Sequence, residues 1–466
     1  MRRFAASLVS AFLTASVLLA SGASRADAKI SPSLRRYPYL TDLVRQGVTV
    51  NWATTTSIGS GSVRWGPPGN CSSHRATALK NTIVVGSTSE YQWRAHITGL
   101  KRGTRYCYRV FGGSDPLIGR RKPSFRAQIP RGTGQPFSFA VFGDWGQVDA
   151  SGNNPGQAKV MSQIATSGAT FAVTTGDTGY PSGSQTNYGD LVQRGPDTGA
   201  IFGHEFWAKA GDRIPLFNAQ GNHGMNATAL VNWPQGHAQA ASRGRYAMQS
   251  YCCQNRTKAA SYPSSWYAFN AGPARFYVLE AAWADSNVGD SNLYRNDFDA
   301  HWRRTRAEYR WLRHDLRTHH RPIAFAFFHF PLYADNPHES SDEWLHGAHR
   351  LEHLLGKHGV DIVFNGHAHI YERNHRSGPR MPISYVTGGG GGKPEPVSNC
   401  SPIDAYSIGW SASATTHGSA CGSAHRPTSI DQVFHFLLVN VDGHTVTVTP
   451  TNANGHRFDV QRYRFG

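Results

Sequence analysis

The residues of this sequence that are best suited to chemistry stand at the ends of short apolar runs. The runs cover 139–146, 171–180, 216–223, 324–330 and 361–373. The polar residues that end them are Asp144, Asp177, Tyr180, Asn222, His223, His329, His367 and His369. Carboxylate, amide, imidazole and phenolate donors without thiolates suit two hard or borderline cations better than a structural zinc. The pattern therefore predicts a two-metal centre of the kind that hydrolases use.

The elements that must position these residues are the strands of an α/β domain. Each apolar run is short enough for a buried strand and stops at a glycine-rich or polar turn. Such strands alternate with helices from residue 137 to about residue 395. The clearest helix is predicted over 301–320, directly before the strand at 321–330. Its apolar residues at near-helical spacing are Trp302, Tyr309, Leu312 and Leu316. Side chains at the carboxyl ends of the strands would converge on one crevice.

A separate β module precedes the α/β domain. Segments 48–55, 61–66 and 105–112 alternate apolar with polar residues and are divided by turn formers, which predicts a β-sandwich. Segment 100–106 resembles the tyrosine corner of fibronectin type III domains.

The domain boundaries follow from these patterns. We expect a fibronectin type III-like domain over 29–130, a linker near 127–136 and a catalytic domain over 137–466. The catalytic domain includes C-terminal strands joined by a hairpin turn at Asp442–Gly443.

The first residues predict a secretory signal over 1–28. They begin with Arg2 and Arg3, continue with an apolar run and end with small residues before Lys29. A membrane anchor is the alternative, but the run is shorter than the ~20 residues that a span needs. Twin-arginine export is a further reading, which the residues after the arginine pair do not support. We expect a secreted, periplasmic or extracellular protein with no membrane span after the signal is removed.

The charge of the chain bears on its partners. The formal net charge is +17, and a basic surface can attract phosphate esters, wall polymers or nucleic acid. Lysine and arginine are scattered and no nucleic-acid motif is present. We therefore expect small phosphate esters as partners and no nucleic acid. The oligomeric state is not predicted.

The cysteines fit an oxidising compartment. The chain has six of them, an even number that in an exported protein indicates disulfides. Cys71 and Cys107 are expected to pair because they lie in the same N-terminal module. Cys252 and Cys253 are expected to reach Cys400 or Cys421 rather than each other. The sequence leaves the full connectivity open.

The order of the metal-binding motifs carries a family resemblance. GDxG at 143–146, GDxxY at 176–180, GNH at 221–223, a strand-end His329 and GHxHxYER at 366–373 follow one another. This order resembles the purple acid phosphatases within the calcineurin-like metallophosphoesterases, from about residue 35 to the C-terminus. The resemblance implies a four-layer β-sheet sandwich flanked by helices, behind an N-terminal all-β domain.

The resemblance also implies which residue binds which cation. Asp144, Tyr180 and His369 would hold the first cation, and Asp177 would bridge the two. Asn222, His329 and His367 would hold the second. Gly146 stands where most calcineurin-like enzymes have a histidine ligand, and Tyr180 is placed to replace it. Because phenolate is a hard anionic ligand, we expect Fe³⁺ in the first position and Zn²⁺, Mn²⁺ or Fe²⁺ in the second.

The function that follows is that of an exported acid phosphatase. Phosphate monoesters would be hydrolysed by a metal-bound hydroxide at the dinuclear centre. His223 would bond a phosphoryl oxygen, and His338 would protonate the leaving group. One alternative is a phosphodiesterase or nucleotide pyrophosphatase with the same centre. A second is a cell-surface binding protein with a vestigial hydrolase domain.

Two neighbouring motifs have competing interpretations. Tyr371, Glu372 and Arg373 are expected to support the ligands rather than to act as catalysts. The glycine run 388–392 could cradle phosphate with its backbone N–H groups. It lacks the lysine and the following helix of a P-loop, so a flexible rim loop is favoured.

Overall fold

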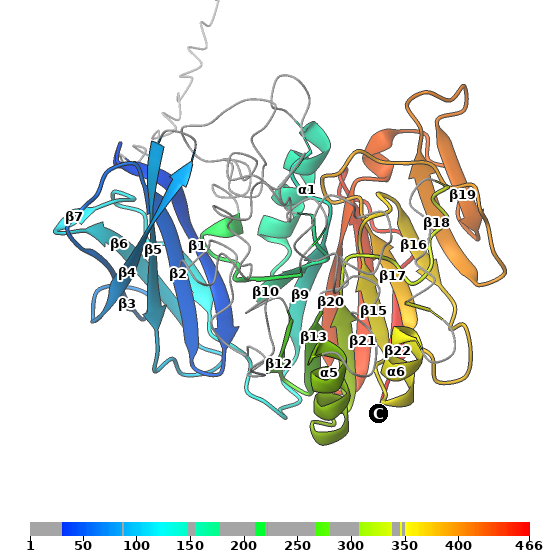
Figure 1. Cartoon of the computed structure of the whole chain (residues 1–466), viewed down its shortest axis with the longest axis horizontal. Coiled ribbons are helices and arrows are strands. Elements are labelled where there is room, and N and C mark those ends of the chain that lie inside the picture. The colour runs from blue at the N-terminus through cyan, green and yellow to red at the C-terminus, as the bar shows by residue number, and fades with distance from the viewer. Residues whose placement is uncertain are drawn as a thin grey trace, which may run out of the picture.

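The structure of the chain is a computed structural model. It describes residues 30–85, 88–147, 154–177, 180, 210–219, 221, 266–279, 307–337, 345–346 and 350–466. The described part consists of an N-terminal group of strands, blue to cyan in Figure 1, beside a larger body of two packed sheets. Among the described residues, no helix is both long and apolar enough to cross a membrane.

The N-terminal part contains only strands. They are β1 (Leu34–Val44), β2 (Gly47–Thr54), β3 (Gly61–Gly66), β4 (His74–Val85), β5 (Thr88–Ile97), β6 (Arg105–Gly112), β7 (Asp115–Pro116) and β8 (Ser124–Arg126). They pair antiparallel in the order β1-β2-β5-β4-β3-β6-β7, with β8 on β6. Trp52 and Trp93 stack in its core with ring centroids 6.2 Å apart. The Tyr106 hydroxyl accepts a hydrogen bond of 2.8 Å from Lys101 N, which is the contact expected of the tyrosine corner.

The first sheet of the larger body contains the strands of three of the predicted runs, 139–146, 171–180 and 216–223. Its strands are β9 (Phe137–Phe142), β10 (Phe171–Thr174), β11 (Leu216–Asn218), β20 (His435–Asp442), β21 (Thr445–Asn452) and β22 (Gln461–Arg464). β9, β10 and β11 are parallel, and β20, β21 and β22 continue the sheet antiparallel beyond β9. A parallel pairing of Thr41 with Leu216 joins this sheet to β1.

The second sheet carries the histidine motifs. Its strands are β12 (Tyr267–Ala271), β13 (Ala274–Val278), β14 (Ile323–Phe327), β15 (Ile362–Asn365), β16 (Tyr371–Asn374), β17 (Ile383–Thr387), β18 (Asp404–Trp410) and β19 (Gly418–Gly422). Their order is β12-β13-β14-β15-β17-β16-β18-β19. The sheets pack through phenylalanines: the ring of Phe139 on β9 lies 5.0 Å from that of Phe276 and 5.4 Å from that of Phe325. The central strands are apolar on both faces because both faces are covered.

Helices lie beside these sheets (Figure 1). α1 (Pro155–Thr166) begins after Asn154, whose side chain accepts from Gln157 N, and Pro155 occupies its first turn. α5 (Ala307–Thr318) covers the described part of the helix predicted over 301–320. Its Tyr309, Leu312 and Leu316 are buried as expected, whereas Trp302 lies outside the described residues. α6 (Leu351–Lys357) connects β14 with β15.

These elements confirm the predicted fold class, an α/β body of packed sheets with helices behind an N-terminal all-β part. The hairpin at Asp442–Gly443 is confirmed as well. Asp442 pairs with Thr445 at the end of β20 and β21, and Gly443 has a φ of +56°, a left-handed conformation that glycine adopts without steric cost.

The disulfides confirm one cysteine prediction and correct another. Cys71 and Cys107 are bonded, with Cα atoms 5.1 Å apart. Cys400 is bonded to Cys421, with Cα atoms 5.4 Å apart, so the expectation that either would reach Cys252 or Cys253 was wrong. The reason is the antiparallel pairing of β18 and β19. In this pairing Cys421 on β19 lies opposite Ser407 on β18, so Cys421 comes close to Cys400 in the loop before β18. Cys252 and Cys253 lie outside the described residues.

Candidate metal centre

The carboxyl ends of four strands from both sheets meet in one place. Asp144 lies two residues after β9, Asp177 three residues after β10 and His329 two residues after β14. His367 lies two residues after β15. Parallel strands deliver their carboxyl ends to the same edge of a sheet. The sequence therefore brings these side chains together because each motif follows its strand by only two or three residues.

The carboxylates and an imidazole form a compact buried group. Asp144, Asp177 and His329 each offer a donor atom, and these atoms all lie within 4.8 Å of one another. His329 Nε2 is 3.2 Å from Asp177 Oδ1. His329 Nδ1 lies 2.9 Å from the carbonyl oxygen of Thr175, which can only accept a hydrogen bond. Nδ1 is therefore the protonated nitrogen of the neutral ring, and Nε2 is left to face the carboxylate.

The hydroxyl of Tyr180 lies where three other candidate ligands converge. It is 2.9 Å from Asp177 Oδ2, 3.4 Å from Asp144 Oδ1 and 2.7 Å from His369 Nε2. His369 Nε2 is in turn 3.4 Å from Asp144 Oδ1. The sequence interpretation in which Tyr180 takes the place left by Gly146 is thus compatible with the geometry. Gly146 itself has a φ of +101°, a conformation that a histidine would adopt only with strain.

The charges of this group are held in a low-dielectric environment. Burial raises the pKa of Tyr180 well above its usual value, and the Asp177 and Asp144 carboxylates raise it further. Burial acts against protonation of His329, but the Asp177 carboxylate outweighs it and raises the pKa of His329 to about 9. Without a cation, protons on these groups would balance the carboxylates.

The backbone is left-handed at four of these residues. The φ angles are +54° at Asp144, +48° at Asp177, +69° at His367 and +52° at His369. Each such conformation of a non-glycine residue costs about 1 kcal/mol or more. Sparsely populated backbone conformations of this kind cluster at functional sites, where the surrounding structure holds them in place.

His367 lies on the His329 side of the group. Its backbone N donates to Asp144 Oδ1 at 2.9 Å, which fixes the turn that carries both histidines. Its ring centroid is 5.0 Å from that of His329 and 4.2 Å from that of Phe330. The two imidazoles are therefore neighbours on one side of Asp177, while Tyr180 and His369 are neighbours on the other.

The glycine run 388–392 has a role that the sequence interpretation missed. It is buried rather than a flexible rim loop. A Cβ on Gly388 would lie 2.5 Å from His369 N, and one on Gly392 would lie 2.9 Å from the His369 ring. The next residue, Lys393, accepts a bond of 2.8 Å from His369 Nδ1 through its carbonyl oxygen. The run thus packs against His369 and orients its ring, and the only sequence signal was the absence of side chains there.

The remaining predicted residues divide into two groups. Asn222, His223 and His338 lie outside the described residues. Tyr371 and Arg373 direct their polar atoms to Asp459, at 2.7 Å each, and not to the strand-end group. Their expected role in supporting the ligands therefore stays a prediction.

The donors present fit a dinuclear centre. The group offers two carboxylates and two pairs of neighbouring imidazole or phenol groups, and it is buried. Cations of borderline and hard character bind to donors of these types. Among the described residues, no lysine or arginine forms an ion pair with Asp144. A bound cation would therefore supply positive charge beside this buried carboxylate.

Comparison with known proteins agrees with this geometry. Residues 37–128 match the family model of the purple acid phosphatase N-terminal domain, and residues 137–371 match that of the calcineurin-like phosphoesterases. In Arabidopsis thaliana, purple acid phosphatase 15 is 25% identical over 70% of this chain and 61% of its own length. The Fe(3+)-Zn(2+) purple acid phosphatase 12 of the same plant is 24% identical over 75% of this chain and 70% of its own length.

A solved structure shares the fold. It is a purple acid phosphatase isolated from yellow lupin (Lupinus luteus) seeds, with a TM-score of 0.66 and 20% identity. The match covers 93% of this chain and 75% of the lupin chain. The chain spans 61%, 57% and 62% of the lengths of the first three curated relatives. The chain belongs to the calcineurin-like phosphoesterase family and, within it, to the purple acid phosphatases.

Proposed function

We propose that this chain is an exported, metal-dependent acid phosphatase that hydrolyses phosphate monoesters. The observation that carries the proposal is the position of Asp177 between two groups of donors. Its Oδ2 faces the Tyr180 hydroxyl at 2.9 Å, and its Oδ1 faces His329 Nε2 at 3.2 Å. A carboxylate whose two oxygens face opposite donor groups is suited to bridge two cations.

The two donor groups suggest two different cations. Asp144, Tyr180 and His369 would hold the first, for which the phenolate favours Fe³⁺. His329 and His367, together with Asn222 from the sequence motif, would hold a divalent ion. Zn²⁺, Mn²⁺ and Fe²⁺ all suit these ligands, and a relative whose name contains Fe(3+)-Zn(2+) favours zinc. Bound there, the cations would neutralise charge on the phosphoryl group and make water more acidic.

The protein side chains would position the substrate and move its protons. His223 would donate to a phosphoryl oxygen from the motif that also carries Asn222. His338 would donate a proton to the leaving alcohol. Both assignments rest on the motifs, because these residues lie outside the described part of the chain. The strand-end group is buried, and a low-dielectric environment strengthens polar interactions.

Export is supported by the disulfides Cys71–Cys107 and Cys400–Cys421, since such bonds persist in oxidising compartments. It also agrees with the signal predicted over 1–28. Detection of the chain in the culture medium or periplasm, with its N-terminus at Lys29, would test this part of the proposal.

The decisive experiment compares substrates on metal-loaded protein. An aryl phosphate monoester and the corresponding bis-aryl diester are offered over a range of pH, with metal analysis of the same sample. We expect about one iron and one divalent ion per chain and a higher kcat/KM for the monoester under acidic conditions. Preferred turnover of the diester would instead favour the phosphodiesterase alternative. Full metal content with no turnover of either ester would contradict an enzymatic role.

A further inference from the structure

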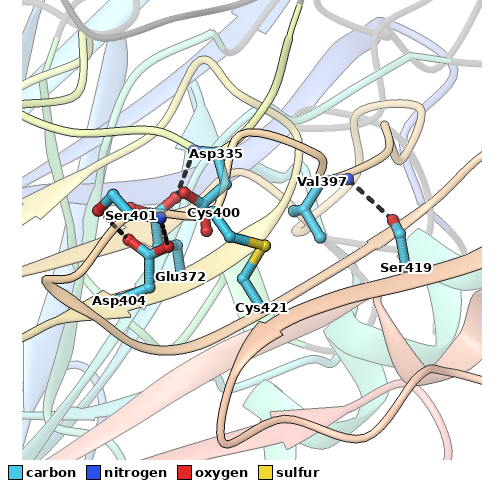
Figure 2. Close-up of a disulfide and its surroundings, with 8 residues drawn as sticks. All are labelled: Asp335, Glu372, Val397, Cys400, Ser401, Asp404, Ser419 and Cys421. Carbon is cyan, nitrogen blue, oxygen red and sulfur yellow. Dashed lines mark hydrogen bonds between the residues drawn. A yellow bond between two sulfur atoms is a disulfide. The ribbon is translucent and has the colours of Figure 1, made fainter.

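A second group of buried carboxylates lies away from the strand-end group, on one face of β16 and β18. Glu372 on β16 pairs with Ser407 on β18, and Asn374 pairs with Asp404 after a register shift between Arg373 and Asn374. Because of this shift, Ser407 and Asp404 share a face although they are three residues apart on β18. Residues two apart on a strand share a face, and directly paired residues of neighbouring strands do so as well. Glu372, Asn374, Asp404 and Ser407 therefore point to the same side of the sheet. Asp335, in the loop after β14, lies over this face (Figure 2).

The three carboxylates are close together and buried. Asp335, Glu372 and Asp404 each offer an oxygen atom, and these oxygens lie within 4.8 Å of one another. Asp335 is 2% exposed, Glu372 is 0% exposed and Asp404 is 9% exposed. Asp335 N donates to Glu372 Oε2 at 2.7 Å, so the loop is fixed directly over the strand. Three like charges at this separation repel one another strongly unless something neutralises them.

No positively charged side chain neutralises them within the described part of the chain. None of the ion pairs found there includes Asp335, Glu372 or Asp404. Arg373, the neighbour of Glu372 on β16, is bound in a two-point ion pair to Asp459 instead. The surroundings are also apolar, with Ile370, Val386 and Val397 in one small cluster. Glu372 accepts hydrogen bonds from Asp335 N and Asn374 Nδ2, and Asp404 accepts from Ser401 N and Oγ. These carboxylates therefore have hydrogen-bond donors, but no cationic side chain balances their charge.

Independent evidence for a missing partner comes from polar atoms on the same face. Asp335 Oδ2, Asn374 Oδ1 and Ser407 Oγ are buried and have no hydrogen-bond partner. Ser407 is fully buried and lies directly opposite Glu372, and its hydroxyl is close enough to Asp335 to act against the rise of the pKa of that carboxyl. Asn374 Nδ2 donates to Glu372 Oε1 at 2.6 Å, which leaves its amide oxygen as an unused acceptor. Buried polar atoms without partners are uncommon in folded proteins, and a bound water or ion is one way in which they are satisfied.

The chemistry of the available atoms identifies the class of ligand. All of them are oxygens, from three carboxylates, one amide and one hydroxyl. The nearby sulfurs of Cys400 and Cys421 are joined in a disulfide and cannot act as thiolates. Oxygen ligands in an irregular arrangement suit Ca²⁺, whereas Mg²⁺ demands a near-ideal octahedron and retains waters. We propose that Asp335, Glu372, Asn374, Asp404 and Ser407 form a structural Ca²⁺ site, separate from the catalytic centre.

The site would fix the loops around the catalytic centre. The Asp335 carbonyl oxygen accepts from Ser398 N at 3.0 Å and from Asn399 N at 3.2 Å, so the loop that contains Cys400 is attached to the loop that follows His329. Glu395 N donates to the His369 carbonyl oxygen at 3.1 Å in the same loop. A cation here would join both loops to β16 and β18 and restrict their movement.

The experiment measures Ca²⁺ binding by the iron-loaded full-length protein at pH 7.5. Isothermal titration with Ca²⁺ at concentrations up to about 1 mM covers the affinities of extracellular calcium modules. We expect one additional Ca²⁺ per chain, a higher melting temperature with Ca²⁺, and an unchanged iron content. Ser407→Ala removes only one hydroxyl and should fold, and it should weaken Ca²⁺ binding by about tenfold. Asp335→Asn should abolish binding.

Asp361→Asn is the matched control, because Asp361 is a carboxylate outside this group whose partner is Ala324 N. It should bind Ca²⁺ as the wild type does. Absence of Ca²⁺ binding by the wild type would overturn the proposal, and so would equal Ca²⁺ affinity in the wild type and Asp335→Asn. Because iron content and phosphatase turnover are measured separately, failure of this site is distinguishable from failure of the proposed function.

Discussion

Carboxylates gather in two places in the described part of this molecule, the strand-end group and the β16–β18 group, and the backbone around them differs. At the strand ends, Asp144 and Asp177 stand in left-handed turns and face imidazole and phenol groups. On the β16–β18 face, Glu372 and Asp404 stand on paired strands with a register shift between Arg373 and Asn374, and they face an amide and a hydroxyl. Mixed nitrogen and oxygen donors suit iron and zinc, and oxygen donors alone suit calcium.

The two groups differ in the backbone conformation that positions them, and this difference fits the reactive role proposed for the strand-end group and the structural role proposed for the β16–β18 group. Left-handed turns at strand ends are strained, and non-glycine residues in such conformations cluster at functional sites. A site on the face of two paired strands needs no such turns, since strand pairing already aligns its side chains. The β16–β18 site is covered by the loop that carries Asp335.

The largest effect is expected from removal of the bridging carboxylate. Asp177→Asn should lower kcat on a phosphate monoester by about a thousandfold or more, because both cations lose a shared ligand. Metal analysis should show loss of iron and of the divalent ion. Asp335→Asn is the paired control from the other group and should retain iron and most of the turnover. Retained turnover in Asp177→Asn would contradict the bridging role.

Replacement of the phenol should have the next largest effect. Tyr180→Phe removes a hard anionic ligand, so affinity for the trivalent ion should fall by about 10- to 100-fold. Any visible absorption band that arises from charge transfer between phenolate and iron should disappear. An unchanged spectrum in the iron-loaded variant would show that the Tyr180 hydroxyl does not bind iron.

Loss of the disulfide next to the second group should affect stability. The double variant Cys400→Ser/Cys421→Ser should lower the free energy of unfolding by about 2–4 kcal/mol, since the bond closes a loop of the chain. It should also weaken Ca²⁺ binding, because the loop that contains Cys400 and leads into Asp404 becomes less constrained. Cys71→Ser/Cys107→Ser should lower stability similarly but leave Ca²⁺ affinity unchanged. Equal Ca²⁺ affinities in both double variants would show that the Cys400–Cys421 bond does not support the cation site.

The smallest effect concerns pH in Ca²⁺-free protein. Burial and the neighbouring Asp404 raise the pKa of Asp335 to about 7 from a usual value of 3.8. The folded state therefore binds a proton more tightly than the unfolded state, so this contribution to stability is complete below pH 3.8 and is lost as pH rises through about 7.

Urea unfolding at about pH 4.5 and pH 7.5, with Ca²⁺ removed, tests this sign. The wild type should lose stability relative to Asp335→Asn as pH rises, because the amide carries no charge to bury. The same difference between the two proteins at both pH values would contradict the pKa shift.

Features that depend on neighbouring residues could be predicted, and features that depend on distant ones could not. The helix Ala307–Thr318 and the Asp442–Gly443 hairpin follow from local periodicity and turn chemistry. The Cys400–Cys421 bond was mispredicted because it depends on which strands pair. The packing of the glycine run 388–392 against His369 was missed for the same reason.

The sequence by itself determined the candidate ligands and their order, because each follows a short apolar strand within six residues and needs no distant partner to be recognised. Only the tertiary structure decided that Asp177 faces Tyr180 with one oxygen and His329 with the other. Likewise, only the register of β16 and β18 and the loop over them bring Asp335, Glu372 and Asp404 together. Nothing in the local sequence of these three residues specifies that register, since strand pairing is fixed by burial over the whole sheet.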